Sequence, residues 1–317
     1  MLTETKYPAT LLENFVEQYS MKPTFSIIIL THKRDDALPL TIARIKEKIG
    51  IDGFRLILVD NNTDGEDRRV LLAGFADKVV VVSGDNLGVA EGRNRGMQHA
   101  RGEFVLFLDD DALLDVSDTF KERIATLFDE DKKLQAIAFR SFVGHERIEQ
   151  PQEFPHTDKT FRRDEAFETF RFIGVAHAVR RTAFEQTGGY CASFFYGMEE
   201  FDLAYQLMKK GGKILYLPEF AVQHMKNANG RLPAKSVLVR MYTNKLAIAW
   251  MHLPAPYLIA CSAAWFIKTA WDARSLAASF EGMMKFWENK TKNAYRPRKP
   301  SFALTRKIQA LGGSAWK

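Results

Sequence analysis

Three consecutive carboxylates, Asp109, Asp110 and Asp111, are the side chains whose type and spacing most clearly suit chemistry. They follow five apolar residues, 104–108, and so short an apolar run predicts a strand buried on both faces of a parallel sheet. Open α/β sheets bind their ligands at the carboxyl ends of such strands. Neighbouring carboxylates repel one another, and a divalent cation with oxygen ligands, Mg²⁺ or Mn²⁺, would relieve that repulsion. A solvated acidic turn that caps the next helix is the alternative for these residues taken alone.

Two further segments have residues that suit a nucleotide. Asp60 ends a second apolar run, where a carboxylate can accept a hydrogen bond from a base N–H or a ribose hydroxyl, although Asp-Asn-Asn is also strong turn chemistry. Residues 85–96 contain three glycines and two arginines. Backbone N–H groups at a helix N-terminus beside Arg93 suit a diphosphate. Helix packing with a cap at Asn86 is the alternative.

A sheet is needed to bring these side chains together. Residues 24–30, 54–59, 79–82 and 104–108 are predicted strands, and a helix capped by Asp35 or Asp36 is expected after the first. Strands that alternate with helices predict right-handed βαβ units and a mostly parallel sheet, so the expected fold class is α/β. The carboxyl ends of parallel strands share one edge, and the residues there are polar: Thr31, Asp60, Ser83 and Asp109.

Composition and charge restrict the class of protein. The chain has 317 residues, with 46% hydrophobic and 26% charged residues, which is ordinary for a globular protein. Two distant cysteines indicate a reducing compartment, and the first 20 residues contain no apolar signal segment, so we expect a cytoplasmic protein. The net charge of +6 is concentrated in residues 286–317, which carry eight Lys and Arg and one Glu. That tail indicates an anionic partner.

In order and spacing, these residues resemble the family 2 glycosyltransferases, which have the GT-A fold, over about residues 24–250. The matching segments are FSIII at 25–29, VDNN at 59–62, NLG at 86–88, RNRG at 93–96 and the stretch 102–111. The resemblance implies a Rossmann-like sheet flanked by helices. It also implies a UDP- or dTDP-sugar donor, held by Thr31, Arg34, Asp60, Asn86, Gly88, Arg93, Asp109 and Asp110. Asp109 and Asp111 would form the D-x-D pair, and Asp111, Asp109 and His224 would bind Mn²⁺ or Mg²⁺.

The second half of the chain carries the acid that the resemblance implies as catalytic base. The family has an acidic pair before an acceptor-side helix, and its base is the second member, which here is Glu200. The family usually has Asp at that position, so Glu199 and Asp202 remain candidates. The chain lacks the Q-x-x-R-W motif of many processive members, so transfer of one sugar is expected. Residues 144–170 are an expected acceptor-side loop, and residues 172–180 and 213–218 are predicted strands.

The chain is expected to have three parts: an N-terminal helix at 1–23, a catalytic domain at 24–245 and a helical, basic extension at 246–317. Residues 246–267 are nearly uncharged, but Pro254 and Pro256 favour two shorter helices over a membrane span. With the basic tail, an aromatic belt beside charged residues predicts peripheral attachment to the inner face of the cytoplasmic membrane. The belt consists of Trp250, Trp265, Phe266, Lys268, Trp271 and Arg274. Packing on the catalytic domain or on a second copy in a homo-oligomer is the alternative.

The expected function is therefore metal-dependent, inverting transfer of one sugar to a hydroxyl of a cell-surface glycan or a lipid-linked acceptor, with no nucleic-acid partner. One alternative is a catalytically silent scaffold of the same fold that binds nucleotide or glycan. Another is a nucleotidyltransferase, but its glycine-rich first loop has no counterpart at residues 31–34.

Overall fold

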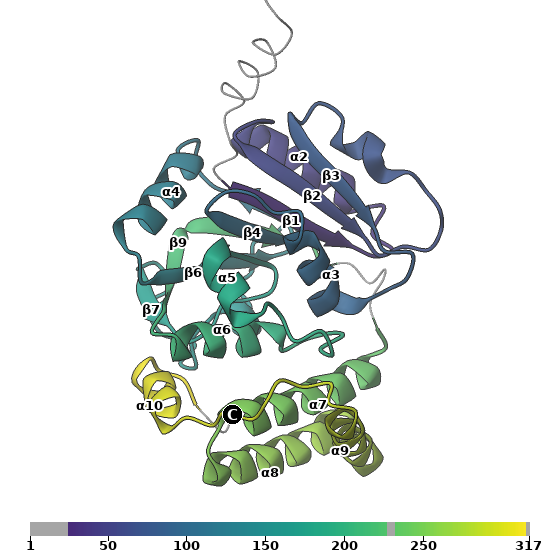
Figure 1. Ribbon diagram of the computed structural model, residues 1–317, viewed down its shortest axis with the longest axis vertical. Coiled ribbons are helices and arrows are strands. Elements are labelled where there is room, and N and C mark those ends of the chain that lie inside the picture. Colours follow the sequence, from purple (N-terminus) through teal and green to yellow (C-terminus); the bar gives the residue numbers. More distant parts are fainter. Residues whose placement is uncertain (1–24, 227–231, 315–317) are drawn as a thin grey trace, which may run out of the picture.

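The computed structural model describes residues 25–226 and 232–314 (Figure 1). The N-terminal helix expected at residues 1–23 lies outside the described residues. The described chain contains β1 (Phe25–Thr31), α2 (Leu38–Ile49), β2 (Phe54–Asp60), η1 (Arg68–Leu72), β3 (Asp77–Val82), α3 (Gly88–Met97), β4 (Phe104–Asp109), β5 (Ala112–Asp115), α4 (Phe120–Glu130), β6 (Leu134–Val143), η2 (Pro151–Glu153), β7 (Phe167–Thr169), β8 (Ala176–Arg180), α5 (Arg181–Thr187), α6 (Glu199–Lys209), β9 (Lys213–His224), α7 (Ala234–His252), α8 (Ala255–Asp272), α9 (Leu276–Thr291) and α10 (Phe302–Ala310).

One sheet of nine strands organises the described chain, in the order β3-β2-β1-β4-β8-β6-β9-β5, with β7 beside β9. The four strands β3, β2, β1 and β4 are parallel, as their connecting helices predict. β8 runs antiparallel to both β4 and β6, because the connection from β6 to β8 contains no crossover α-helix. The α/β class is confirmed, and the sheet is parallel on one side and mixed on the other.

The side chains of β1 alternate between the two faces of the sheet. Phe25, Ile27 and Ile29 pack in a core with residues of α2 and α4, whereas Ile28 packs in a second core with residues of α3, α5 and α6. A Cβ at Gly96 of α3 would lie 2.7 Å from the Ile28 side chain, so this glycine allows α3 to lie close to the sheet. All four of these β1 side chains are at most 1% exposed, which confirms a strand buried on both faces.

The C-terminal helices α7, α8, α9 and α10 lie together below the sheet in Figure 1. Pro254 separates α7 from α8, so the uncharged stretch forms parts of two helices, as predicted. Within residues 25–226 and 232–314, none of the helices combines the length and hydropathy that a membrane crossing requires. The expected domain limit at residue 245 falls inside α7. Of the expected aromatic belt, Trp250, Trp265 and Phe266 are partly buried against the core and Trp271 is exposed, and contact of these residues with lipid stays a prediction.

Two local predictions differ from the structure. The residue before α2 is Ala37, with no side-chain cap, because Asp35 instead accepts hydrogen bonds from Arg68. The predicted strand at residues 172–180 is shortened to β8, whose first residue is Ala176. Before it, the carbonyl of Val175 still accepts a hydrogen bond from Asp109 N of β4, and the Gly174 carbonyl bonds to the Arg93 side chain.

Candidate active site

The acid triplet lies where β4 ends, at the carboxyl edge of the parallel strands. Asp109 is partly exposed, whereas Asp110 and Asp111 are 7% and 3% exposed. The Asp110 carbonyl accepts a 2.8 Å hydrogen bond from Thr41 Oγ1, and the Asp111 carbonyl accepts one of 2.8 Å from Met225 N. Burial and the charge of Asp111 raise the pKa of Asp110 to about 8. The backbone thus fixes three acids in a position where their charges oppose one another.

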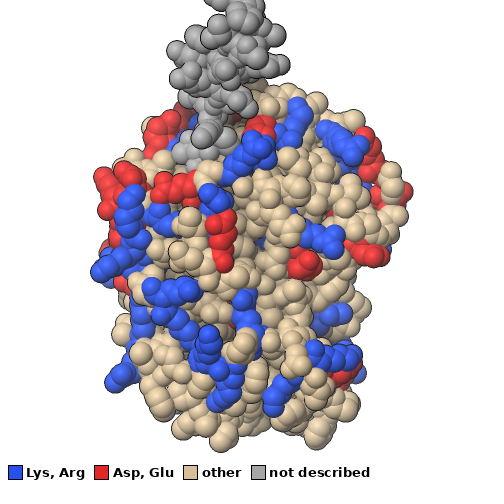
Figure 2. Space-filling model, in the orientation of Figure 1, with Lys and Arg blue, Asp and Glu red and all other residues tan. Residues whose placement is uncertain are grey.

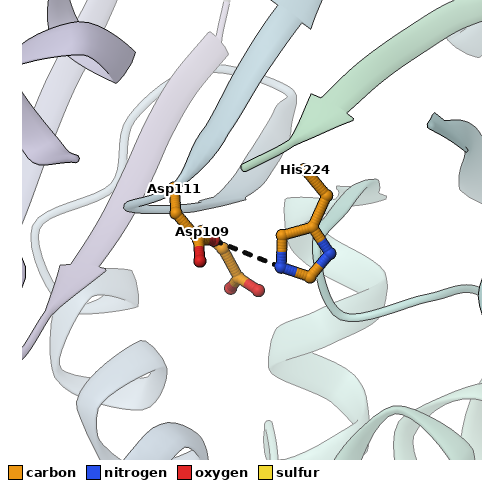
Figure 3. A group of neighbouring side chains, drawn as sticks. All are labelled: Asp109, Asp111 and His224. Atoms are coloured by element: carbon orange, nitrogen blue, oxygen red, sulfur yellow. Dashed lines mark ion pairs between the residues drawn. The ribbon is translucent and has the colours of Figure 1, made fainter. Parts of the chain in front are cut away.

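His224, the last residue of β9, lies beside the acid triplet. Ala112, directly after the triplet, pairs with His224 between β5 and β9. His224 Nε2 lies 3.3 Å from Asp111 Oδ1. Figure 3 shows the Asp109, Asp111 and His224 side chains converging, and one ligand atom from each lies within 4.8 Å of the other two. Two carboxylates and an imidazole are a donor set that Mn²⁺ accepts, and Mg²⁺ accepts the carboxylates, so the residues present fit the divalent cation that the sequence predicts.

Glu153 supports His224 from the side opposite Asp111. His224 Nδ1 lies 3.0 Å from Glu153 Oε1, and Lys226 and Ser141 also contact this carboxylate. Burial opposes the charge of Glu153, but these hydrogen bonds outweigh it and lower the pKa of Glu153 to about 2. Burial also opposes the charged form of His224 and so lowers its pKa, but the carboxylates of Asp111 and Glu153 outweigh this effect and raise the pKa to about 9. Glu153 was not predicted. It lies in the segment expected to be an acceptor-side loop, where one Glu among many polar residues gives no local signal.

Arg93 connects the triplet to the second half of the chain. Its guanidinium contacts Asp109 Oδ1 at 2.8 Å, Glu199 Oε1 at 3.1 Å and the Gly174 carbonyl at 2.8 Å. Arg93 is 3% exposed, and its carboxylate neighbours raise its pKa against the effect of burial. The sequence predicted that Arg93 holds a diphosphate. In the structure the guanidinium is buried among these partners and joins the two acidic regions in one network, and its contact with a diphosphate stays a prediction.

Glu200 lies beside this network. A Cβ at position 174 would lie 2.3 Å from Glu200 Oε1, so Gly174 leaves the space that the carboxylate occupies. Glu200 is partly buried. Burial raises its pKa, Arg93 and Arg171 oppose that rise, and Asp109 adds to it. Glu199 is 3% exposed, and burial and Glu200 raise its pKa although it pairs with Arg93. Of the two acids, Glu200 is the more accessible and the one without the Arg93 ion pair.

Asp202 lies in a different environment. It is fully buried, with Oδ1 2.7 Å from His252 Nε2 and Oδ2 3.2 Å from Arg296 Nε. Both partners belong to the C-terminal part of the chain, α7 and the segment before α10. The sequence left Asp202 as a candidate base. Both carboxylate oxygens are engaged and the residue is not exposed, so the geometry favours Glu200 over Asp202 as the base.

Asp60 ends β2 and is 2% exposed. Its Oδ1 accepts hydrogen bonds from the backbone and side-chain nitrogens of Asn62, at 2.9 and 2.8 Å, and its Oδ2 lies 3.1 Å from Arg68. Arg68 also pairs with Asp35, Asp64 and Glu66, so four acids surround this guanidinium. A hydrogen bond donated by a base N–H to Asp60 stays a prediction, and it would use the acceptor lone pairs that the contacts with Asn62 and Arg68 leave. Arg68 was not predicted, because a separation of eight residues from Asp60 carries no recognisable pattern.

The other predicted donor-binding residues lie near the same edge. Thr31 ends β1 and is buried, and Arg34 Nη1 lies 3.2 Å from Asp111 Oδ2. Asn86 Oδ1 accepts a hydrogen bond from Gly88 N, and the next amide, Val89 N, bonds to the Phe195 carbonyl at 2.7 Å. Two backbone N–H groups at the start of α3 therefore already donate within the protein, one to the Asn86 side chain and the next to the Phe195 carbonyl. Gly88 has φ +77°, and a Cβ there would collide with Phe195, so the glycine is required by packing.

Comparison with known proteins supports the family resemblance that the sequence shows. The model of the family described as "Glycosyl transferase family 2" matches residues 26–188, more than half of the chain. The O-antigen chain rhamnosyltransferase WbaN of Salmonella anatum is 24% identical over 219 residues, 66% of this chain and 68% of that protein. The minor teichoic acid biosynthesis protein GgaB of Bacillus subtilis is 30% identical over 139 residues, 42% of this chain and 15% of that protein.

Two solved structures share the fold. The mannosyltransferase PcManGT from Pyrobaculum calidifontis, solved with GDP-Man and Mn²⁺, has a TM-score of 0.56 and 19% identity, over 92% of this chain and 85% of that chain. GalNAc-T7, solved with UDP, GalNAc and Mn²⁺, has a TM-score of 0.59 and 16% identity, over 88% of this chain and 59% of that chain. From the family match, the relatives and the fold, this chain belongs to glycosyl transferase family 2 and is a glycosyltransferase with the GT-A fold.

Proposed function

We propose that this chain is a metal-dependent, inverting glycosyltransferase that moves one sugar from a nucleoside-diphosphate donor to a hydroxyl of a cell-surface glycan or a lipid-linked acceptor. The observation that carries the proposal is the single network of Asp111, His224, Asp109, Arg93 and Glu199, with Glu200 beside it. Such a network supplies a cation site and a general base at one edge of the sheet. The two relatives named for O-antigen and teichoic acid synthesis support a surface glycan as the product.

In this proposal Glu200 takes the proton of the acceptor hydroxyl as the oxygen attacks the anomeric carbon from the face opposite the diphosphate. A carboxylate is a weak base in water, and the raised pKa of Glu200 makes it a better proton acceptor. Arg93 holds Glu199 and Asp109 in place. Arg34, beside Asp111, brings positive charge to the end of β1, where it can face a diphosphate. A cation held by Asp109, Asp111 and His224 would supply Lewis-acid stabilisation of the departing diphosphate.

The test is a panel of nucleotide sugars with Mn²⁺, in which thermal shift identifies the donor and product release measures turnover. We expect Glu200→Gln to reduce turnover about 10²- to 10⁴-fold while the donor still binds, because only the proton acceptor is lost. Asp111→Asn should also weaken Mn²⁺-dependent donor binding. Glu185→Gln, at an exposed acid of α5 that pairs with Arg181, is the matched control and should change neither.

Three results would contradict the proposal. A wild-type chain that binds a donor but neither hydrolyses nor transfers it would be a silent scaffold. Release of pyrophosphate in place of nucleoside diphosphate would indicate a nucleotidyltransferase. Full turnover by Glu200→Gln would exclude Glu200 as the base.

A further inference from the structure

We infer that the outer faces of α8 and α9 form a docking surface for a membrane that contains anionic lipids. Seven large apolar side chains on these helices are between 52% and 82% exposed. We call them the apolar face: Ile259, Ile267 and Trp271 on α8, and Leu276, Phe280, Met284 and Trp287 on α9. This inference does not depend on the proposed catalytic mechanism.

The spacing of the apolar face indicates a continuous surface. On α9 its members recur every three or four residues, so they lie along one side of the helix. On α8 the exposed residues 260, 263 and 264 are all alanine, and the exposed pair of Lys268 and Asp272 lies beside Ile267 and Trp271. The opposite sides of both helices are buried: Cys261, Ala278 and Phe286 contribute to the cores. The two helices therefore pack inward with one side and present the other outward.

Charge around the apolar face identifies the occupant. Within residues 234–314, seven Lys and Arg are exposed, against two exposed acids, Asp272 and Glu288. In Figure 2 the lower end of the molecule is tan at its tip, with blue patches above it and little red. Apolar and aromatic side chains that enter the acyl region, flanked by cations that meet phosphate headgroups, are the features of an interfacial membrane anchor. The cations disfavour a second copy as occupant, because symmetric contact would bring two excesses of positive charge together.

This surface differs from the belt that the sequence predicted. Trp250 and Trp265 pack inward, and only Trp271 of the four predicted aromatic residues is among the large exposed side chains. Helix α9, which the sequence analysis did not single out, provides four of the seven members. Lys290 lies 4.1 Å from the centre of the Trp287 ring, so a cation and an aromatic anchor stand side by side at the end of this helix.

The experiment is cosedimentation of the full chain with vesicles of phosphatidylcholine alone and of phosphatidylcholine with phosphatidylglycerol. We expect binding to the anionic vesicles that weakens as salt is raised. The triple variant Trp271→Ser, Phe280→Ser, Trp287→Ser should reduce the partition coefficient at least about tenfold, because three large apolar groups no longer leave water. The control is the double variant Leu40→Ser, Val70→Ser. It removes two apolar side chains of similar exposure, 57% and 70%, which lie on α2 and η1 and do not belong to the apolar face. It should bind as the wild type does.

A second variant tests the charges. Arg274→Glu, Lys292→Glu changes two exposed cations of this region and should remove the preference for anionic vesicles while the fold, followed by near-ultraviolet circular dichroism, is unchanged. The inference is overturned if the wild type binds neither vesicle, or if the triple variant binds as well as the wild type. It is also overturned if the wild type is a dimer that the triple variant dissociates, since the apolar face would then be a contact between copies. Donor hydrolysis by the triple variant should equal that of the wild type, which separates this result from the test of catalysis.

Discussion

His224 is held from both sides of its ring, by Asp111 at Nε2 and by Glu153 at Nδ1. A metal-binding imidazole needs one nitrogen free of a proton, and a carboxylate at the other nitrogen fixes which one that is. Glu153 can do this because Ser141 and Lys226 hold its carboxylate in turn. The ring is therefore oriented toward the Asp109 and Asp111 carboxylates by a residue that does not itself belong to the cation site.

We expect Glu153→Gln to lower the affinity for Mn²⁺ about 10- to 100-fold, the usual effect of losing the carboxylate behind a ligand histidine. The glutamine keeps the size of the side chain but not its charge. Calorimetric titration of the folded protein with Mn²⁺ measures the effect without any assay of turnover. Glu149→Gln is the control, because Glu149 pairs with Arg140 and Arg163 instead of His224. Equal affinities in wild type and Glu153→Gln would show that Glu153 does not support the ligand.

At the scale of elements, the parallel strands could be predicted because each is a short apolar run with a polar residue at its end. Those local patterns suffice for β1, β2 and β4, and with them for the place of the acid triplet. The resemblance supplied His224 and Glu200. What could not be predicted depends on contacts between distant residues: Arg93 with Glu199, His224 with Glu153 and Asp60 with Arg68. A side chain's partner across the fold leaves no periodicity in the sequence.

The shortened strand β8 shows the same limit. The apolar pattern of residues 172–180 predicts one strand, but the Gly174 carbonyl bonds to the Arg93 side chain, and Val175 makes only one further hydrogen bond to β4, from Asp109 N. The strand therefore begins only at Ala176. Its next residue, His177, is fully buried between the rings of Phe107 and Phe172. β8 thus carries an ionisable ring into the core of the sheet.

His177 makes the stability of the fold depend on pH. Burial and Arg93 lower its pKa well below 6.5, so His177 stays neutral in the folded chain while the unfolded chain protonates near pH 6.5. Its contribution is therefore complete above pH 6.5 and is lost as the pH falls below that value, by up to about 1.4 kcal/mol per pH unit. In urea unfolding, the free energy of unfolding of the wild type should fall relative to that of His177→Phe as the pH is lowered from about 7 to about 5. A difference in free energy of unfolding that stays constant over this pH range would contradict the prediction.

At the scale of the whole molecule, the C-terminal helices are joined to the catalytic part by buried charge as well as by apolar packing. Asp202, on the helix that carries Glu200, meets His252 at the end of α7 and Arg296 beyond α9. Arg296 also donates to the carbonyl of Thr187, at the end of α5. The same few residues therefore fix the helix that carries the proposed base and the helices that carry the apolar face.

Asp202→Asn should weaken that junction and leave the chemistry intact. The amide has nearly the shape of the carboxylate, but it leaves Arg296 without its buried counter-charge, and breaking a buried pair costs about 3–5 kcal/mol. Urea unfolding should report a loss of that order, and protease should cut the C-terminal helices faster. Asp129→Asn, which breaks an exposed pair with Lys132, should cost far less, because water screens that pair. Folded Asp202→Asn should retain the wild-type turnover, because the proposed proton acceptor is Glu200.

Two outcomes would contradict this prediction. A folded Asp202→Asn variant with turnover as low as that of Glu200→Gln would assign Asp202 to the catalytic site. A loss of stability no larger than that of Asp129→Asn would show that the junction does not depend on the charge of Asp202.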